Sequence, residues 1–279
     1  MDKLLIVDGH NLLFQMFFGM PSRIVNKNGV AIWGTLGFVG ALLKIIKQVN
    51  PTHAVVIFDG ETHNERTDIS ADYKANRPDW SAVEAEMNPF SQLPDVIKAL
   101  NYLKIKYFET VDCECDDVIS SYVYAYGNEC EIVISSFDSD FFQLVSEKVS
   151  VLRYRGKNSV ICTPQYVLQK TGVSPELYLH FKCLTGDGSD NIKGVCKIGQ
   201  KTAAQLINKF GTVQNLIANA DLIERESIRL SVKQSEQTIL TNYRLIKLGD
   251  CARLPYDLCQ LNISKINAST MQVLKAIGL

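Results

Sequence analysis

The sequence predicts an α/β fold in which a mostly parallel central sheet carries helices on both faces and is followed by a helical region. Over residues 1–162, short continuous apolar runs, typical of strands buried on both faces, alternate with amphipathic helical patterns. Two such runs with a helix between them make a βαβ unit, whose strands are parallel. From Thr163 onward only helical patterns recur. We therefore expect an α/β domain at 1–162 and a helical region at 163–279.

The individual elements follow from local patterns. Strands are predicted at 4–7, 54–58, 105–108 and 131–135, with a small β-ribbon at 149–153 and 159–162 that turns at Gly156. Helices are predicted at 12–18, 35–49, 95–103 and 118–126, and in the second region at 175–184, 201–209 and 213–218. Thr163 and Pro164 are an N-cap and a first helical residue, so another helix begins there. The last sixty residues or so are predicted to be helical and then irregular, without chemistry.

Carboxylates recur where the predicted elements begin or end. Asp8 and Asp59 follow strands, Glu114, Asp116 and Asp117 open a helix, Asp138 and Asp140 follow another strand, and Asp187 and Asp190 lie in a Gly-rich loop. Helix capping explains one or two acids in a first helical turn, because free N–H groups and the macrodipole stabilise them. It does not explain the acids at the strand ends, which a parallel sheet delivers to one edge. Nine carboxylates in these places predict a divalent-metal site.

Composition bounds the class of protein. The chain has 279 residues, 46% of them apolar, enough for a substantial buried core. No apolar run reaches the length of a membrane span and a strand begins at Lys3, so we expect a cytoplasmic protein without a secretory signal. Cysteines stand at 113, 115, 130, 162, 183, 196, 251 and 259, without a C-x-x-C pair. We expect them to be reduced and mostly in the core, and not to bind zinc.

Taken by itself, the net charge of −1 argues against a polyanionic partner. Setting aside the nine carboxylates as metal ligands changes −1 to +8 for the rest of the chain. Such a protein can attract nucleic acid while a negative pocket holds cations. The charge is therefore compatible with DNA binding but does not establish it.

The segment 61–94 interrupts the alternation of strands and helices. It is polar, contains Tyr73-Lys74-Ala75-Asn76-Arg77-Pro78, and is longer than an ordinary connection. A mobile cover or arch over the active edge of the sheet accounts for this composition, and a solvated insertion accounts for it equally well. The composition alone leaves both interpretations open.

In combination, the motifs resemble those of the bacterial and phage 5′ nucleases of the flap-endonuclease family, which includes the 5′-nuclease domain of DNA polymerase I. They are Val7-Asp8-Gly9, Phe58-Asp59, Tyr73-Lys74-Ala75-Asn76-Arg77, Glu114-x-Asp116-Asp117, Asp138-x-Asp140, Gly186-Asp187-Gly188-Ser189-Asp190-Asn191 and Gly194-Val195-x-x-Ile198-Gly199-x-Lys201-Thr202-Ala203. The resemblance covers roughly the first 220 residues, and no polymerase segment follows, as in a stand-alone member. It implies a PIN-like α/β fold with an arch at about 61–94 and a helix-three-turn-helix at about 175–210.

The resemblance implies that the carboxylates hold two divalent ions, Mg²⁺ or Mn²⁺, used to hydrolyse phosphodiesters. Asp138, Asp140, Asp116 and Asp117 are expected around the first ion, with Glu114, Asp8 and Asp59 close by, and Asp187 and Asp190 at the second. Two ions about 4 Å apart can activate water and stabilise the leaving 3′ oxygen. Lys74 and Arg77 would engage the scissile phosphate and Tyr73 would stack on an unpaired base, while Arg66 occupies a basic position of the same region.

The resemblance also implies a DNA-binding loop in the helical region. Backbone and side-chain contacts to phosphates are expected from Gly194, Lys197, Gly199, Lys201 and Thr202. Such contacts read no bases, so binding would follow the shape of the DNA. A K⁺ ion is expected in the same loop, held largely by backbone carbonyls at Leu184, Thr185, Lys193, Val195 and Ile198.

Two departures from the family pattern bear on the substrate. Gln15 stands where many relatives carry an Arg, and the segment 79–92 has acids and little positive charge. Either would weaken capture of the 5′ strand.

The expected function is a metal-dependent 5′-3′ exonuclease and flap endonuclease of replication or repair, acting on DNA with 5′ flaps, overhangs or ends. Monomer is the default expectation. A structure-specific DNA-binding protein with a vestigial metal site is one alternative, which the full acidic set and Lys74 disfavour. A PIN-like ribonuclease is another, which the helix-three-turn-helix disfavours.

Overall fold

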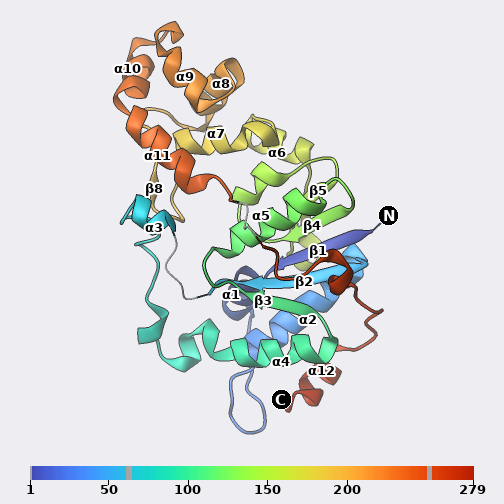
Figure 1. Cartoon of the computed structure of the whole chain (residues 1–279). Coiled ribbons are helices and arrows are strands. Elements are labelled where there is room, and N and C mark those ends of the chain that lie inside the picture. The colour runs from blue at the N-terminus through green and yellow to red at the C-terminus, as the bar shows by residue number, and fades with distance from the viewer. Residues whose placement is uncertain (1, 61–64, 250–252) are drawn as a thin grey trace.

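A six-stranded sheet forms the centre of the computed structural model, which describes residues 2–60, 65–249 and 253–279 (Figure 1). The strands are β1 (Lys3–Asp8), β2 (His53–Phe58), β3 (Lys106–Glu109), β4 (Glu131–Ser135), β5 (Val149–Arg153) and β6 (Val160–Cys162). Their order is β3-β2-β1-β4-β5-β6, and every neighbouring pair is parallel except β5 and β6. The predicted mostly parallel sheet is therefore confirmed. The predicted β-ribbon is real, but its first strand also extends the main sheet as a parallel neighbour of β4.

Helices cover both faces of this sheet (Figure 1). On one face lie α1 (Gly9–Gly19), α2 (Trp33–Val49), α4 (Leu93–Leu103) and α12 (Thr270–Ala276), and on the other lies α5 (Cys115–Tyr126). Alternate residues of β1 serve the two layers, since Leu5 and Val7 pack with α1 and α2 while Leu4 and Ile6 pack with α5. All four of these side chains are fully buried, which explains the continuous apolar run.

The helical region follows β6. It comprises α6 (Pro164–Thr171), α7 (Pro175–Thr185), α8 (Gln200–Phe210), α9 (Val213–Ala218), α10 (Glu226–Gln234) and α11 (Glu236–Ile246). Between α7 and α8, β7 (Gly186–Asp187) and β8 (Ile192–Lys193) form a hairpin. Thr163 caps α6 as predicted, with its hydroxyl accepting a hydrogen bond from the Tyr166 N–H.

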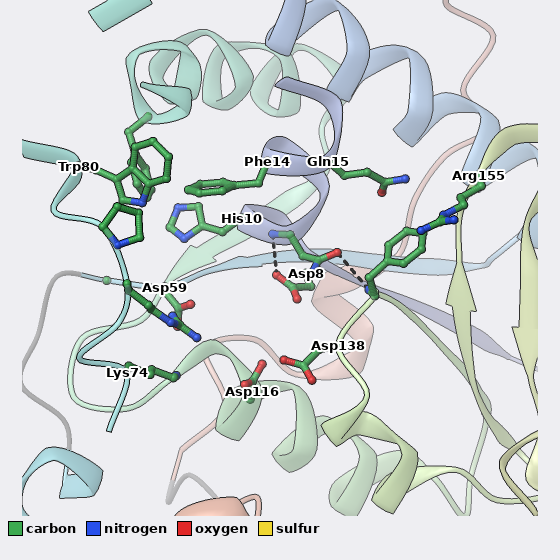
Figure 2. A pocket seen from close by; sticks show the side chains of 16 residues that line it. Asp8, His10, Phe14, Gln15, Asp59, Lys74, Trp80, Asp116, Asp138 and Arg155 are labelled. Atoms are coloured by element: carbon green, nitrogen blue, oxygen red, sulfur yellow. Dashed lines mark hydrogen bonds between the residues drawn. The ribbon is translucent and has the colours of Figure 1, made fainter. Parts of the chain in front are cut away.

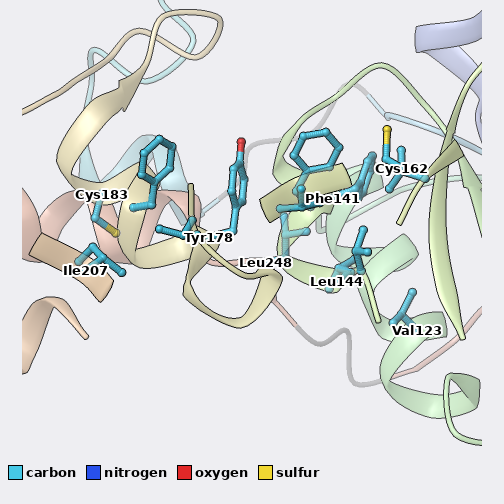
Figure 3. Close-up of a cluster of buried hydrophobic side chains, with 14 of the residues drawn as sticks. Val123, Phe141, Leu144, Cys162, Tyr178, Cys183, Ile207 and Leu248 are labelled. Atoms are coloured by element: carbon cyan, nitrogen blue, oxygen red, sulfur yellow. The ribbon is translucent and has the colours of Figure 1, made fainter. Parts of the chain in front are cut away.

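One apolar cluster joins the sheet to the helical region (Figure 3). It runs from Val123 of α5 through Phe141 in the 3-10 turn Asp140–Leu144 to Tyr178 of α7 and Ile207 of α8. Because α7 packs directly on that turn, the hairpin after α7 is held close to the end of β4. The carboxylates of the two regions are therefore brought to the same side of the molecule.

The predicted arch begins outside the described residues, since 61–64 are not among them. Its described part contains α3 (Glu65–Ile69), which packs against α11, and 3-10 turns at Trp80–Ala82, Ala85–Met87 and Pro89–Gln92. Gln92 is buried and accepts a hydrogen bond from the Thr35 N–H at 2.9 Å, so the end of the segment is fixed to α2. Pro78, Trp80 and Phe90 line a cavity at the sheet edge.

The cysteine prediction is only partly right. Cys115, Cys130, Cys162 and Cys183 are buried and Cys113 is half-buried, but Cys196 and Cys259 are exposed. These two lie in a loop and a short 3-10 turn, where local apolar neighbours do not produce burial. Cys251 falls outside the described residues. No helix in the described part of the chain has the length and apolar composition to cross a membrane.

Candidate active site

A cavity of about 740 Å³ at the carboxyl edge of the sheet is lined by four carboxylates (Figure 2). Asp8 and Asp59 follow β1 and β2, Asp116 lies in the first turn of α5, and Asp138 follows β4. The parallel topology brings these predicted residues together as expected. We call the four the open carboxylates, because among the described residues no Lys, Arg or His nitrogen lies within 4.0 Å of them.

Asp8 is held in place by two hydrogen bonds. One carboxylate oxygen accepts from the Asn11 N–H at 3.0 Å, which caps α1 and starts it three residues earlier than predicted. The other oxygen accepts from the Ser136 hydroxyl at 2.8 Å, and that hydroxyl accepts from the Asp138 N–H at 3.0 Å. Ser136 therefore ties the end of β1 to the end of β4. Burial raises the pKa of Asp8 to about 7, and the charges of Asp59 and Asp138 add to the rise.

The start of α5 is capped from another strand. Glu114 occupies the N-cap position without a side-chain cap bond, and Asp59 instead accepts from the Cys115 N–H at 2.7 Å. This bond draws the end of β2 to the helix that carries Asp116. Burial raises the pKa of Asp116 well above its usual range, and Asp138 and Asp59 raise it further. Burial likewise raises the pKa of Asp138. Such neighbours cannot all be ionised unless a cation joins them.

The open carboxylates suit a hard divalent ion. Within the described residues, no three acidic, His or Cys side chains stand close enough to hold an ion directly. Mg²⁺ usually takes one or two carboxylates and keeps several waters, so carboxylates spaced around a cavity with room for those waters fit it. Burial raises the pKa values of Asp8, Asp116 and Asp138, and the charges of neighbouring acids add to each rise, so a bound cation would stabilise their ionised forms. An all-oxygen donor set that needs cationic charge is the kind of site that Mg²⁺ or Mn²⁺ occupies.

A second acidic group surrounds Lys182 of α7. Its ammonium donates to Asp187 and lies 3.1 Å from an Asp140 oxygen, and its side chain is 7% exposed. Burial acts to raise the pKa of Asp187, but Lys182 and Ser189 hold it below its usual value. Burial and the charge of Asp138 raise the pKa of Asp140 to about 7 in spite of Lys182. The Lys182 ammonium therefore outweighs the effect of burial on the pKa of Asp187, but it offsets the rise in the pKa of Asp140 only in part.

Lys74 and Arg77 lie at the cavity edge, and each already has a carboxylate partner. Lys74 donates to Glu114 at 2.5 Å and Arg77 donates to Asp190 at 2.9 Å. The backbone of Lys74 is left-handed, with φ at 56°, and its N–H donates to the Asp190 carbonyl. The base of the arch is therefore bonded to the hairpin that carries the second acidic group.

Tyr73 is placed differently from the prediction. It is 6% exposed, and its hydroxyl donates to Glu114 at 3.0 Å. Its ring packs with Ile192, Leu245 and Ile246. The ring is buried and has no open face on which an unpaired base could stack. Tyr73 instead positions Glu114 through its hydroxyl.

Arg66 is a buried cross-link and does not line the cavity. Its guanidinium makes two hydrogen bonds of 2.8 Å to Asp117 and one of 2.7 Å to Glu114. It also donates to the carbonyls of Leu245 at 2.9 Å and Lys247 at 3.1 Å. Asp117 further accepts from the Gly249 N–H at 2.7 Å. Arg66 and Asp117 thus join the arch, α5 and the end of α11.

Four of the nine acids share this feature of a fixed cationic partner. We call them the paired carboxylates, and they are Glu114, Asp117, Asp187 and Asp190. Asp140 stands between the open and paired groups. The predicted assignment of Asp117 to the first ion receives no support from its position, because both of its oxygens bond to Arg66.

The predicted DNA-binding loop is exposed along one side. Gly194, Lys197, Gly199 and Lys201 are exposed and Thr202 is half-buried, while Val195 and Ile198 are buried and fix the loop. Gly199 precedes α8 without a side-chain cap, so the first N–H groups of α8 face outward. A Cβ at Gly194 would lie 2.4 Å from the Thr185 carbonyl oxygen, so this glycine is required for packing.

The carbonyls predicted to hold K⁺ lie around this packed turn. The Leu184 carbonyl accepts from the Val195 N–H, and the Val195 carbonyl accepts from the Ile198 N–H. The Lys193 carbonyl accepts from Asn242 at 2.9 Å. Each carbonyl has a second lone pair, so these bonds are compatible with an additional cation.

Aromatic side chains form the roof of the cavity (Figure 2). Phe14 of α1 lies 5.2 Å from Trp80 and 5.3 Å from Phe90, and His10 lies 4.9 Å from Phe90, all between ring centroids. The His10 Nε2 atom is buried without a hydrogen-bond partner in the described residues. The cavity therefore combines an acidic floor with an apolar roof.

Sequence reasoning missed several residues of this site. Ser136 and Lys182 were not predicted, although a lysine inside the apolar stretch of α7 is a signal that was available. The residues near 245–249, which seemed to carry no chemistry, supply backbone partners to Arg66 and Asp117. Nothing in their composition indicates this role.

Two family models match consecutive parts of the chain. Residues 3–172 match the family model of the 5′-3′ exonuclease N-terminal resolvase-like domain, and residues 173–269 match that of the 5′-3′ exonuclease C-terminal SAM fold. A 5′-3′ exonuclease of Bacillus subtilis is 35% identical over 80% of this chain and 76% of its own length. A thermostable DNA polymerase I of Thermus filiformis is 37% identical over 83% of this chain. The chain spans only 26% of that polymerase.

A solved structure shares the fold. The bacteriophage T5 flap endonuclease, in a complex with DNA and metal ions, superposes with a TM-score of 0.72. It is 23% identical, and the match covers 88% of this chain and 89% of that one. The predicted α/β sheet followed by a helical region is confirmed by this match and by the family models. The chain belongs to the 5′-3′ exonuclease family, as its two consecutive family domains and its bacterial relatives show.

Proposed function

We propose that the chain is a divalent-metal-dependent 5′-3′ exonuclease and flap endonuclease that hydrolyses DNA phosphodiesters in replication or repair. The convergence of the open carboxylates on one cavity, with Lys74 at its edge, carries the proposal. The open carboxylates, which have no ion-pair partner among the described residues, suit a bound metal ion. Lys74 beside them suits a phosphate. Membership in the exonuclease family supplies the class of reaction.

The open carboxylates would hold the first ion, and Asp140, Asp187 and Asp190 would hold the second. When bound, the pair of ions activates water and stabilises the leaving oxygen. Mg²⁺ or Mn²⁺ is the proposed metal, since all the donors are oxygens. Asp8 and Asp59 are already fixed by backbone N–H donors, so their oxygens keep their positions whether or not an ion is present.

Lys74 and Arg77 would bind the scissile phosphate from the side of the arch. Their partners Glu114 and Asp190 hold the cationic groups in place before DNA arrives. Positive groups fixed in advance stabilise charge that develops on the phosphate without reorganising during the reaction. Tyr73 and Arg66 act on this step through Glu114, which they position.

The helical region, at 163–279, would bind duplex DNA, and the α/β region, at 1–162, would cut it. Gly194, Lys197, Gly199, Lys201 and Thr202 are the proposed phosphate contacts, next to the K⁺ site formed by the carbonyls described above. These groups contact the backbone and read no bases, so the proposed substrates are defined by shape: DNA with 5′ flaps, overhangs or ends. The proposed working form is a monomer in the cytoplasm.

A cleavage assay tests the function directly. A 5′-labelled flap duplex and a matching RNA strand are incubated with Mg²⁺ or with chelator, and products are resolved by length. We expect Mg²⁺-dependent cleavage of the DNA that leaves 5′-phosphate and 3′-hydroxyl ends. Binding without cleavage would favour a DNA-binding protein with an inactive metal site, and preferential cleavage of RNA would favour a ribonuclease.

A variant pair assigns the role of Lys74. Lys74→Ala should slow single-turnover cleavage more than it weakens DNA binding, because Lys74 acts at the phosphate. Lys98→Ala is the matched control, since Lys98 is exposed on α4 and pairs with Asp95 of the same helix. An unchanged cleavage rate in Lys74→Ala would remove Lys74 from the reaction.

A further inference from the structure

The wall of the cavity opposite Lys74 carries a cation that the proposed mechanism does not use. Phe137, Gln15 and Arg155 form this wall, and in Figure 2 Arg155 lies across the open carboxylates from Lys74. The cavity therefore has positive charge on two sides of its acidic floor.

The fold fixes the backbone that presents Arg155. The Tyr154 carbonyl accepts from the Gln15 side chain at 2.6 Å, which ties the end of β5 to α1. The Arg155 N–H donates to the Ser159 hydroxyl at 2.9 Å, and the turn that follows depends on Gly156, whose φ is 58°. The Arg155 carbonyl accepts from the Asn158 N–H at 3.0 Å, so the backbone of Arg155 is anchored on both sides of its Cα.

An aromatic ring orients the guanidinium toward the cavity. The Arg155 guanidinium lies 4.9 Å from the centroid of the Phe137 ring. Phe137 is itself fixed, because its N–H donates to the Asn11 side chain at 3.0 Å and it directly precedes Asp138. The Arg155 side chain is thus held at a set position relative to an open carboxylate, with its N–H donors at the ring edge left for a ligand.

Charge pairing distinguishes Arg155 from the other cations of the cavity. Lys74 bonds to Glu114 and Arg77 bonds to Asp190. In the described part of the chain, no carboxylate oxygen lies within 4.0 Å of the Arg155 guanidinium. A planar guanidinium with five donors and no anion is a phosphate-binding group.

We propose that Arg155, supported by Phe137, binds the phosphodiester next to the scissile one in the strand that is cut. This inference rests on the proposed nuclease function. A strand carries one negative charge per nucleotide, so a phosphate above the open carboxylates brings a second one beside it. The open carboxylates repel this adjacent phosphate wherever no metal ion lies between them. Arg155, on the cavity wall, offsets that repulsion. Arg155 would thereby set the direction in which the DNA strand runs away from the open carboxylates.

The test combines a protein change with a substrate change. Binding of a 5′-flap duplex is measured in Ca²⁺ for the wild type and Arg155→Gln, and single-turnover cleavage is measured in Mg²⁺. The substrates carry one uncharged methylphosphonate at the linkage on either side of the scissile phosphate. We expect Arg155→Gln to weaken binding of the natural flap about fivefold and to reduce the salt slope by about one.

The coupling between the two changes decides the proposal. At one of the two linkages, the methylphosphonate should weaken wild-type binding by a similar factor but leave Arg155→Gln binding unchanged. Arg155→Lys should recover part of the affinity and of the salt slope. Lys148→Gln is the matched control, because half-buried Lys148 precedes β5 at the opposite end of that strand and donates to the Asn128 carbonyl at 2.7 Å, not to a group of the cavity. It should bind like the wild type.

Three outcomes separate the possibilities. Additive effects at both linkages would overturn the role of Arg155, even if the wild type cleaves the flap normally. An equal loss in Lys148→Gln would show a general effect of net charge and would also overturn it. Failure of the wild type to cut any flap in Mg²⁺ would instead reject the proposed function on which the inference rests.

Discussion

The open and paired carboxylates lie side by side at one edge of the protein, yet they depend on different sources of positive charge. Asp187 keeps a pKa below its usual value because Lys182 and Ser189 counter its burial. Asp8, at the same 8% exposure, has its pKa raised to about 7, since burial is countered only by neutral hydrogen-bond donors. Burial alone therefore does not determine the pKa of a carboxylate in this site. A nearby cation lowers the pKa of Asp187 but only partly offsets the rise at Asp140, and the open carboxylates depend most on a bound metal ion for positive charge.

The largest expected effect comes from removing an open carboxylate. Asp138→Asn should lower single-turnover cleavage in Mg²⁺ by about a thousandfold, because a metal contributes several kcal/mol of transition-state stabilisation. Flap binding in Ca²⁺ should change little, since Asp138 is not among the proposed DNA contacts. Cleavage within tenfold of the wild type would place the metal elsewhere.

Removing the cation of a paired group should affect stability first. Arg66→Met leaves Glu114 and Asp117 buried beside an uncharged side chain, which should lower the free energy of unfolding by about 3–5 kcal/mol. Urea unfolding followed by circular dichroism measures this loss. Lys233→Met, which breaks an exposed pair with Asp221, should lower the free energy of unfolding far less, because solvent screens an exposed pair. Similar losses in both variants would refute the distinction between buried and exposed pairs.

Converting a paired site into an open one gives the most direct test of the comparison. Lys182→Met removes the ammonium between Asp140 and Asp187, and in chelator should lower the free energy of unfolding by about 2 kcal/mol. Mg²⁺ or Mn²⁺ should restore more stability to this variant than to the wild type, because an ion then supplies the missing charge. A loss that metal does not reverse would mean that Lys182 acts through packing alone.

The smallest expected effect is a pH dependence of the metal-free protein. The pKa values of Asp8 and Asp140 are raised to about 7 from 3.8, so the folded state keeps protons that the unfolded chain releases. The free energy of unfolding in chelator should therefore be highest at low pH within this range and fall as the pH rises from about 4 to about 7. Saturating Mg²⁺ should flatten the fall. Thermal melts across this range, with and without Mg²⁺, measure the difference, and parallel curves would contradict it.

The sequence alone determined the type of fold and the identity of the acids. Apolar runs of four and five residues directly before Asp8 and Asp59 indicate parallel strands, and parallel strands place their ends at one edge. The nine acids were all recognisable from local pattern and family resemblance. Local signals suffice here because each acid sits next to the element that positions it.

Only the tertiary structure decided which acids are open and which are paired. Arg66 reaches a carbonyl 179 residues away, Asp117 accepts from a backbone N–H 132 residues away, and Gln15 bonds to the carbonyl before Arg155 across 139 residues. Periodicity describes which way a side chain faces on its own element and contains no information about partners on distant ones. Lys182 and Arg155 are ordinary cations in the sequence. The packing of α7 gives Lys182 two carboxylate neighbours, whereas the end of β5 places Arg155 where no carboxylate oxygen of the described residues lies within 4.0 Å.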